Sequence, residues 1–247
     1  MSVYYIFLRE LRSYFQSFVA YVLIAIFLLL AGYFLYSDLI KYFIFSMSKL
    51  EFGRVWEFYF NDLRYVLLII LPPLTMRLFA EEKKLGTIEL LWTYPLRDWE
   101  LLAGKYLASL SIFLLMLALT LITPVIFNLS YDSAVTPLWA GYLGLLLLGS
   151  SFITCGMFVS SLTENQIVAA VGTYAVLVMF WSLTYNESIA NAEVLNFLFR
   201  FSLFDRLLTF RRGGIDIKDI IFFFNFHVVF ITLTMFSLST RRWRGMK

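Results

Sequence analysis

The stretch Phe18–Tyr36, FVAYVLIAIFLLLAGYFLY, decides the fold class of this chain. It contains 19 residues and no charged side chain. A helix needs about 20 predominantly apolar residues to cross the hydrocarbon of a bilayer. The run is also longer than the apolar part of a cleaved secretory signal, which holds about 7–15 residues. We therefore expect a helix that remains in the membrane as the first of several spans.

The composition of the whole chain agrees with a membrane protein. Of the 247 residues, 61% are hydrophobic and 15% are charged, whereas soluble domains are about 25% charged. The 27 Phe, 15 Tyr and 6 Trp residues suit the hydrocarbon and its two interfaces. A net charge of +3 gives no argument for nucleic-acid binding, which needs a basic patch. A single cysteine, Cys155, excludes an internal disulfide and a thiolate metal cluster.

Further apolar runs predict six membrane-spanning helices in one all-α integral membrane domain, residues 1–247. The expected spans are 18–36, 63–79, 106–127, 138–162, 166–185 and 219–240. Residues 37–62 are expected to form a loop with a short interfacial helix. Pro72 and Pro73 predict a kink or break, because proline removes a backbone donor; this is tolerated where neighbouring spans cover the freed carbonyls. Small residues in the fourth run predict close helix contacts.

Residues 1–17 predict an amphipathic helix that lies in the membrane interface. Its polar face is expected to hold Arg9, Arg12, Ser13 and Gln16, and its apolar face Phe7, Leu8, Leu11, Tyr14 and Phe15. The alternative is a solvated beginning of the first span.

The usual motifs of nucleotide and metal chemistry are missing from the sequence. Around Gly104-Lys105, Trp99 stands where a phosphate-binding loop needs its first glycine, and Tyr106 stands where it needs Ser or Thr. The single histidine, His227, cannot build a His-based metal site. A lone histidine inside the membrane more often forms a hydrogen bond to a neighbouring helix than it takes part in proton or metal chemistry. We therefore expect a chain that is not an enzyme and has no cofactor of its own.

The polar stretch Glu81–Lys105 predicts a short helix, a stop and a second helix. Gly86 permits a tight turn, and Thr87 can begin the short helix. One face of that helix would carry the apolar residues, at i, i+3 and i+4 spacing. These are Ile88, Leu91 and Trp92.

Pro95 is expected to end the short helix, since proline disfavours helix in the residue before it. Asp98 suits the N-cap of the next helix, and Glu100 suits its first turn. We expect the short amphipathic helix to lie on the membrane surface. The alternative is an ordinary solvated connector, which would not need the aromatic residues Trp92, Tyr94 and Trp99.

Residues 81–105 contain a fixed order of features. Two acidic residues come first, followed by a Gly-Thr pair, an amphipathic turn, a proline, an acidic cap and a Gly-Lys pair. This pattern resembles the first intracellular loop of ABC-2-type transporter permeases, and the resemblance covers nearly the whole chain. Residues 160–169 resemble the turn between spans four and five in gliding-motility (GldF-like) permeases. Residues 210–219 are similar to the segment before the last span in that group and in copper-site maturation (NosY-like) permeases.

The resemblance implies a permease subunit of an ATP-driven transporter in the inner (cytoplasmic) membrane. Such subunits form homo- or heterodimers and bind separate cytoplasmic ABC ATPase subunits, which hold the ATP and magnesium. It also implies that residues 81–105 form a cytoplasmic coupling loop, that both termini are cytoplasmic, and that residues 186–218 are extracytoplasmic. The residues implied in ATPase coupling are Glu81, Glu82, Gly86, Thr87, Ile88, Glu89, Leu91, Trp92, Pro95 and Asp98.

Charge alone leaves the orientation open. Ten Lys and Arg residues fall on the side of the termini and nine on the other side, although the clusters near the span ends favour cytoplasmic termini. Two other classes of function also stay open. A secondary transporter would need ionisable groups inside the membrane, for which Arg77 and His227 are the candidates. A structural membrane anchor of a motility or secretion complex would need neither.

Overall fold

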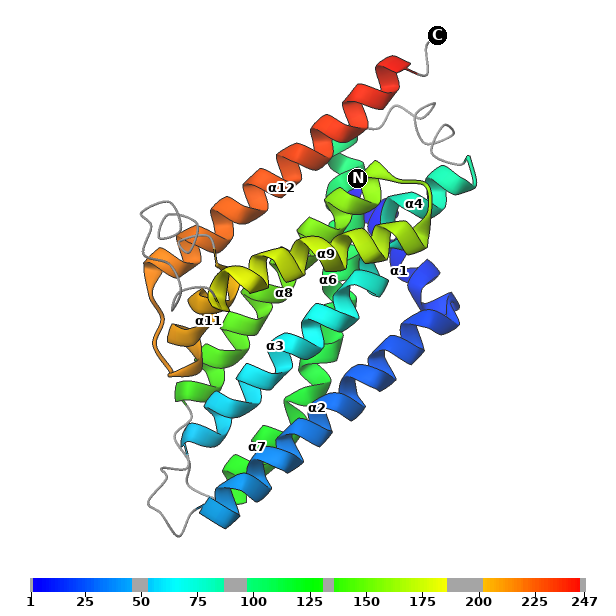
Figure 1. Cartoon of the computed structure of the whole chain (residues 1–247). Helices are drawn as coiled ribbons and strands as arrows, with labels where there is room; N and C mark the ends of the chain where they lie inside the picture. The colour runs from blue at the N-terminus through cyan, green and yellow to red at the C-terminus, as the bar shows by residue number, and fades with distance from the viewer. Residues whose placement is uncertain (1, 46–52, 87–96, 131–135, 186–201, 245–247) are drawn as a thin grey trace.

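The structure is a computed structural model that describes residues 2–45, 53–86, 97–130, 136–185 and 202–244. Within these ranges every regular element is an α-helix, as predicted (Figure 1). The helices are α1 (Ser2–Gln16), α2 (Phe18–Phe45), α3 (Gly53–Thr75), α4 (Arg77–Lys84), α6 (Asp98–Thr120), α7 (Ile122–Ser130), α8 (Thr136–Leu162), α9 (Gln166–Tyr185), α11 (Leu203–Arg211) and α12 (Ile217–Arg244).

Five helical stretches among the described residues are long and apolar enough to cross a membrane. They are Phe18–Ile44, Val55–Lys84, Asp98–Ile126, Pro137–Leu162 and Ile217–Thr240. Residues 166–185, the remaining predicted span, form the apolar helix α9, of which Gln166–Ser182 falls among the shorter apolar helices.

The helices run further than the apolar patterns indicate. Outside residues 46–52, the predicted loop 37–62 is helical, because α2 continues to Phe45 and α3 begins at Gly53. Asp38 and Lys41 lie one turn apart and form an ion pair at 2.8 Å. This pair stabilises helix in the charged residues that follow Tyr36. The helix α11, within residues 186–218, was also not predicted.

Helix α8 is the centre of the bundle. In its most apolar stretch 78% of the residues are buried, against 28% in α2 and 22% in α12. Its glycines let other helices approach its backbone, which confirms the predicted role of the small residues. An added Cβ would lie 2.0 Å from the Phe60 ring at Gly141, 2.6 Å from Phe210 at Gly144, 2.2 Å from the Phe113 ring at Gly149 and 2.1 Å from the Thr75 hydroxyl at Gly156.

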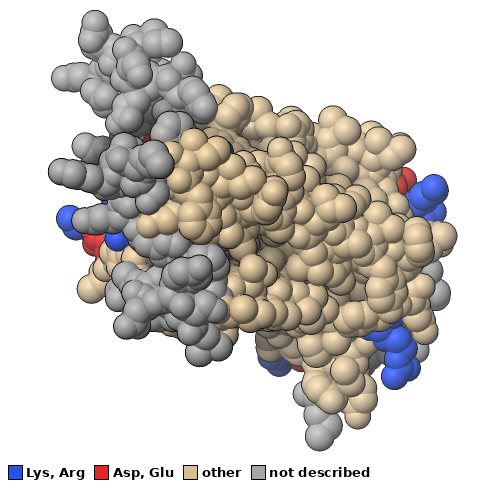
Figure 2. All heavy atoms as spheres, turned by 90° about the horizontal axis from the view of Figure 1, so that it is seen from below, with Lys and Arg blue, Asp and Glu red and all other residues tan. Residues whose placement is uncertain are grey.

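Charged residues and apolar residues separate on the surface. On the face shown in Figure 2, most of the visible Lys, Arg, Asp and Glu lie toward the two ends, a few show at the lower edge, and other residues cover the wide area between. Large apolar side chains are exposed on the outer helices, among them Leu29 of α2, Val171 of α9 and Phe224 of α12. Soluble proteins rarely expose large contiguous apolar patches, so this area suits contact with lipid.

The two ends of the bundle contain different elements (Figure 1). Helices α1 and α4 lie at one end together with the C-terminal part of α12, whose Ser237 bonds the carbonyl of Ser161 near the end of α8. We call this the α4 end. Helices α7 and α11 and the beginning of α12 lie at the opposite end, the α11 end.

Close packing against α8 predicts that Gly156→Ala lowers the melting temperature of the detergent-purified protein. The new methyl group would meet Thr75, a β-branched side chain with little rotamer freedom, and overpacking typically costs about 1–3 kcal/mol. The matched control is Gly32→Ala in the exposed face of α2, where nothing lies within 4 Å of the added carbon. Both changes gain the same helix propensity, so equal melting temperatures for the two variants would contradict the packing role of Gly156.

Candidate functional site

The second candidate span is interrupted at one residue, Met76, between α3 and α4. Helix α3 passes through Pro72 and Pro73 and ends at Thr75. The N–H of Met76 still bonds the carbonyl of Pro72 at 2.9 Å. The predicted break therefore lies shortly after the prolines and is small.

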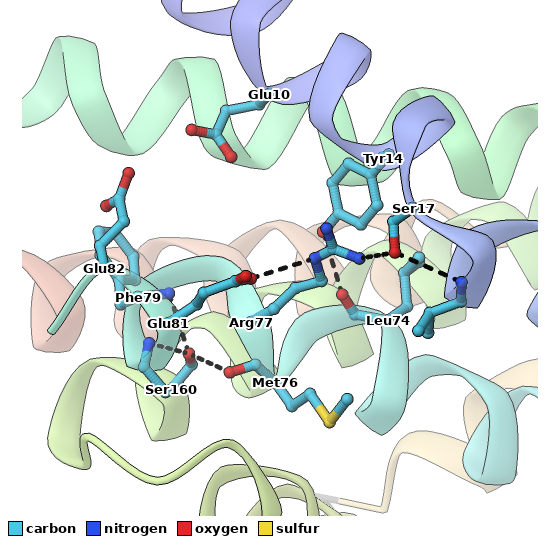
Figure 3. Close-up of polar contacts among 12 residues, drawn as sticks. Glu10, Tyr14, Ser17, Leu74, Met76, Arg77, Phe79, Glu81, Glu82 and Ser160 are labelled. Carbon is cyan, nitrogen blue, oxygen red and sulfur yellow. Dashed lines mark hydrogen bonds and ion pairs between the residues drawn. The ribbon is translucent and has the colours of Figure 1, made fainter. Parts of the chain in front are cut away.

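A serine from another helix caps α4. Met76, at the N-cap position, makes no side-chain cap hydrogen bond. Instead the hydroxyl oxygen of Ser160 in α8 accepts the N–H groups of Phe79 and Ala80, each at 3.1 Å, and donates to the carbonyl of Met76 at 2.9 Å (Figure 3). The first N–H groups of a helix have no partner within it, so Ser160 ties the beginning of α4 to α8.

Helix α1 supports the same interruption from the other side. The buried Tyr14 hydroxyl donates to the carbonyl of Leu74 at 3.0 Å, and burial raises the pKa of Tyr14. The guanidinium of Arg77 lies 5.0 Å from the centre of the Tyr14 ring. Arg77 also donates to Ser17 at 2.8 Å and pairs with Glu81 at 3.4 Å (Figure 3). One arginine thus joins α1, the α1–α2 turn and α4.

Next to this contact lies a cluster of two cations and two carboxylates, which we call the charged junction. The Lys105 ammonium of α6, only 1% exposed, lies 3.1 Å from Glu10 and 2.9 Å from Glu82. Arg9 pairs with the same two carboxylates, at 2.8 Å and 2.9 Å. A buried charge is tolerated only when it is paired, and here the two signs balance.

The charged junction stabilises the ionised forms of Glu10 and Arg9. Burial by itself raises the pKa of Glu10, but Lys105 and Arg9 outweigh it and lower the pKa below its ordinary value. Burial likewise lowers the pKa of Arg9, but Glu10 and Glu82 raise it above its ordinary value.

Gly104 explains how α1 comes so close to α6. An added Cβ there would lie 2.6 Å from Ile6 and 3.3 Å from the backbone nitrogen of Phe7. The absence of a side chain lets the two helices touch backbone to backbone. Gly104 thus brings Glu10 within reach of Lys105.

The charged junction also closes the loop between α4 and α6. Glu82 belongs to the last turns of α4, and Lys105 belongs to the first turns of α6, so their ion pair joins the two ends of the loop. Gly86 has φ +68, a left-handed conformation that glycine adopts without steric cost. The loop therefore leaves α4 by a glycine turn.

The N-cap prediction for Asp98 is wrong by one residue. Helix α6 begins at Asp98, and its N-cap is Arg97. The Glu100 carboxylate reaches back to the N–H of Arg97 at 3.1 Å, as in a capping box. This bond places the cap at Arg97 and leaves Asp98 in the first turn, where its charge suits the helix dipole.

The predicted coupling residues divide into two sets. Glu81 and Glu82 belong to the contacts above, and Gly86 forms the turn, while no ion pair joins Asp98 to the described residues of the charged junction. Thr87, Ile88, Glu89, Leu91, Trp92 and Pro95 lie outside the described residues.

Sequence reasoning did not assign Glu10, Lys105 or Ser160 to a site. A usable signal existed for two of them. Glu10 is the only acidic residue before Asp38, and Lys105 is the only charged residue between Leu101 and Phe127. A lone charge beside an apolar run needs a partner, and these two are each other's partners. Nothing in the sequence indicates Ser160.

The predicted helix in residues 1–17 is present, and the residues of its apolar face divide between the bundle and the surface. Tyr14, assigned to the apolar face, is 2% exposed, and its hydroxyl bonds the Leu74 carbonyl inside the bundle. Ile6 is buried on the same side. Tyr4, Tyr5, Leu8 and Phe15 remain exposed, together with the polar residues Arg12, Ser13 and Gln16.

His227 forms the predicted bond to a neighbouring helix. Its Nδ1 lies 2.7 Å from the carbonyl of Phe223, and its Nε2 lies 3.1 Å from the hydroxyl of Ser150 in α8. Because a carbonyl can only accept, Nδ1 carries a proton and donates it to Phe223. Among the described residues, no group of three His, Cys, Asp or Glu side chains could hold a metal ion.

Long apolar helices between charged ends define a multi-pass membrane protein. Residues 56–204, more than half of the chain, match the family described as ABC-2 family transporter protein, and the chain belongs to this family. The match runs from α3 to the beginning of α11 and includes the loop between α4 and α6. Membership implies a place in the membrane and a cytoplasmic ATPase as partner. A comparison with curated proteins found no match.

The charged junction predicts that Lys105→Met destabilises the protein strongly. Removing one partner of a buried ion pair costs about 3–5 kcal/mol, and here Glu10 and Glu82 would share Arg9 as their one remaining cation of the charged junction. We expect a clear fall in melting temperature in detergent, whereas Lys218→Met, at an exposed position of α12, leaves it unchanged.

A second variant separates charge from packing. Adding Glu82→Gln to Lys105→Met restores the balance of one cation and one carboxylate, so part of the lost stability should return. If Lys105→Met melts at the same temperature as Lys218→Met, the charged junction contributes nothing to stability.

Proposed function

We propose that this chain is the permease subunit of an ATP-driven ABC-2 transporter in the inner membrane, where it crosses the bilayer six times. The observation that carries this proposal beyond the family match is the ion pair between Glu82 and Lys105. It closes the loop after α4, and Glu10 of α1 binds the same ammonium. Because this ion pair fixes both ends of the loop, a displacement of the loop by a bound protein would also displace the membrane helices.

In this proposal the loop 81–105 docks into a separate cytoplasmic ATPase, which binds and hydrolyses ATP with magnesium. The apolar face of Ile88, Leu91 and Trp92 forms the contact. Movement of the ATPase then displaces α4, α6 and α1 together, because the charged junction links all three. The interruption at Met76 lets α4 change its angle to α3. Two permease subunits then open a path along their shared surface to one side of the membrane and to the other in turn.

The arrangement of the helices supports six crossings. Helix α9 contains 20 residues, Gln166–Tyr185, enough for a span with little tilt. An even number of crossings agrees with α1 and the C-terminal part of α12 lying at the same end (Figure 1). The exposed apolar faces of α2, α9 and α12 are available to lipid and to a second permease subunit.

The contacts of the two intramembrane candidates favour ATP-driven over ion-coupled transport. Arg77 is held by Ser17 and Glu81, and both ring nitrogens of His227 have partners. An ion-coupled carrier needs ionisable groups that can exchange protons or ions. A role in gliding motility or export follows only from the resemblance of two short segments, and a structural anchor is distinguished from a permease by the experiments below.

Six crossings with cytoplasmic termini predict which end of the bundle is reached from outside the cell. Lys84 is exposed at the α4 end and Ile215 at the α11 end. In a Cys155→Ala background, we expect an impermeant maleimide to label Ile215→Cys in intact cells and Lys84→Cys only after permeabilisation. Labelling of Lys84→Cys in intact cells would overturn the orientation.

The docking role of the loop predicts that Trp92→Ala weakens ATPase binding without lowering the membrane yield. A buried aromatic anchor is worth about 2 kcal/mol or more at an interface, roughly 30-fold in affinity. The measurement is the amount of ATPase that co-purifies with the tagged permease from mild detergent. The control is Trp139→Ala, near the beginning of α8 and outside the loop, where the side chain is 57% exposed.

The other outcomes assign different roles to Trp92. A lower membrane yield with normal ATPase recovery would make Trp92 an anchor in the lipid interface. Full recovery with full yield would remove Trp92 from the coupling surface. We also expect the permease, freed of its ATPase, to hydrolyse no ATP.

A further inference from the structure

A pair of arginines lies at the α11 end, where α3 packs against α11. Arg211 of α11 is 8% exposed and donates one terminal nitrogen to the side-chain oxygen of Asn61. Arg64 of α3 donates one terminal nitrogen to the Tyr65 hydroxyl at 2.8 Å. The Nε atoms of both arginines are buried, and neither has an acceptor among the described residues. Two hydrogen-bond donors are thus left unused in a place shielded from water.

Aromatic rings hold the Arg64 guanidinium in place. Its central carbon lies 4.7 Å from the centre of the Tyr65 ring and 5.5 Å from that of Phe204. The two rings are nearly parallel, with their centres 6.4 Å apart. Stacking on aromatic faces is typical of arginines that are pre-oriented to bind planar or tetrahedral anions.

Among the described residues, the positive charge of the arginine pair is not balanced by an ion pair. Burial and the neighbouring Arg64 lower the pKa of Arg211, Arg212 acts in the same direction, and Glu57 and Tyr65 oppose them. Glu57 itself pairs with Arg212 at 3.5 Å. In the described part of the chain no carboxylate forms an ion pair with Arg64 or Arg211, whereas Arg77, Lys105 and Arg206 all have one. Two like charges shielded from water are costly unless an anion joins them.

We propose that Arg64 and Arg211 form a binding site for a phosphate group. The guanidinium group offers paired N–H donors in a rigid plane, a geometry that matches two oxygens of a phosphate monoester or diester. The free Nε donors and the unbalanced charge are what such a group would satisfy. The phosphate could belong to a lipid headgroup or to a soluble compound.

The test is the thermal unfolding of the full-length chain, delipidated in a neutral detergent, with three probes. These are dioctanoyl phosphatidylglycerol, dioctanoylglycerol as the phosphate-free lipid, and inorganic phosphate. A ligand that binds only the folded state raises the melting temperature with its concentration. A response to the phospholipid alone identifies a headgroup site, and a response to inorganic phosphate as well identifies a site for free phosphate. Dioctanoylglycerol should have no effect.

Matched variants locate the response. Arg211→Gln and Arg64→Gln should each weaken the apparent affinity about tenfold or more, the usual effect of losing a hydrogen bond between charged groups. Arg211→Lys keeps the positive charge but not the paired N–H donors. Its apparent affinity should lie between those of the wild type and Arg211→Gln. Lys218→Gln removes an exposed cation at the same end and should respond like the wild type.

The stability without ligand provides an independent criterion. If the pair exists to bind an anion, Arg211→Gln relieves repulsion and melts, without probe, at or above the wild-type temperature. A purely structural arginine pair predicts the opposite, a clear loss of stability in Arg211→Gln and Arg64→Gln alike. That loss, or no response of the wild type to the phospholipid and to phosphate, or an equal response of the glutamine variants, would overturn the proposal.

Discussion

The architecture of the α4 end depends on satisfying the backbone around Met76, where the second span is interrupted shortly after Pro72 and Pro73. Backbone polar groups in an apolar environment must find partners within the protein. Here the partners come from two other helices, since Tyr14 of α1 bonds Leu74 and Ser160 of α8 caps α4. These contacts seat α1 against the bundle and fix the direction in which α4 leaves it. That direction places Glu82 beside Lys105.

The two ends of the bundle differ in whether their buried cations have carboxylate partners among the described residues. At the α4 end, Lys105 and Arg9 are matched by two carboxylates, which produces a closed, neutral unit of three helices. At the α11 end, Arg64 and Arg211 share a shielded space with no such match among the described residues. A neutral unit is suited to transmit movement, because displacing any one member would expose a buried charge. An unbalanced pair is suited to bind a charged ligand.

The errors of the sequence-based predictions have local physical causes. Charged residues 38–41 indicated a loop, but the ion pair within one turn keeps α2 helical. Asp98 is a good cap by residue type, but Glu100 reaches back and makes Arg97 the cap. In each case a contact outweighs the preference of the single residue.

The sequence by itself determined that the chain is helical and lies in the membrane. Uninterrupted apolar runs leave a helix as the only element that satisfies its own backbone in hydrocarbon, and this argument needs no knowledge of neighbours. It also indicated the loop through its glycine, proline and acidic residues. Only the tertiary structure decided that Glu10, Glu82 and Lys105 meet, that Ser160 caps α4, and that Arg64 lies near enough to Arg211 to affect its charge. Electrostatic and hydrogen-bond energies depend on distances of a few ångströms in space, and residues separated by 70 or more positions in the sequence, such as Arg9 and Glu82, reach those distances only once the helices are packed.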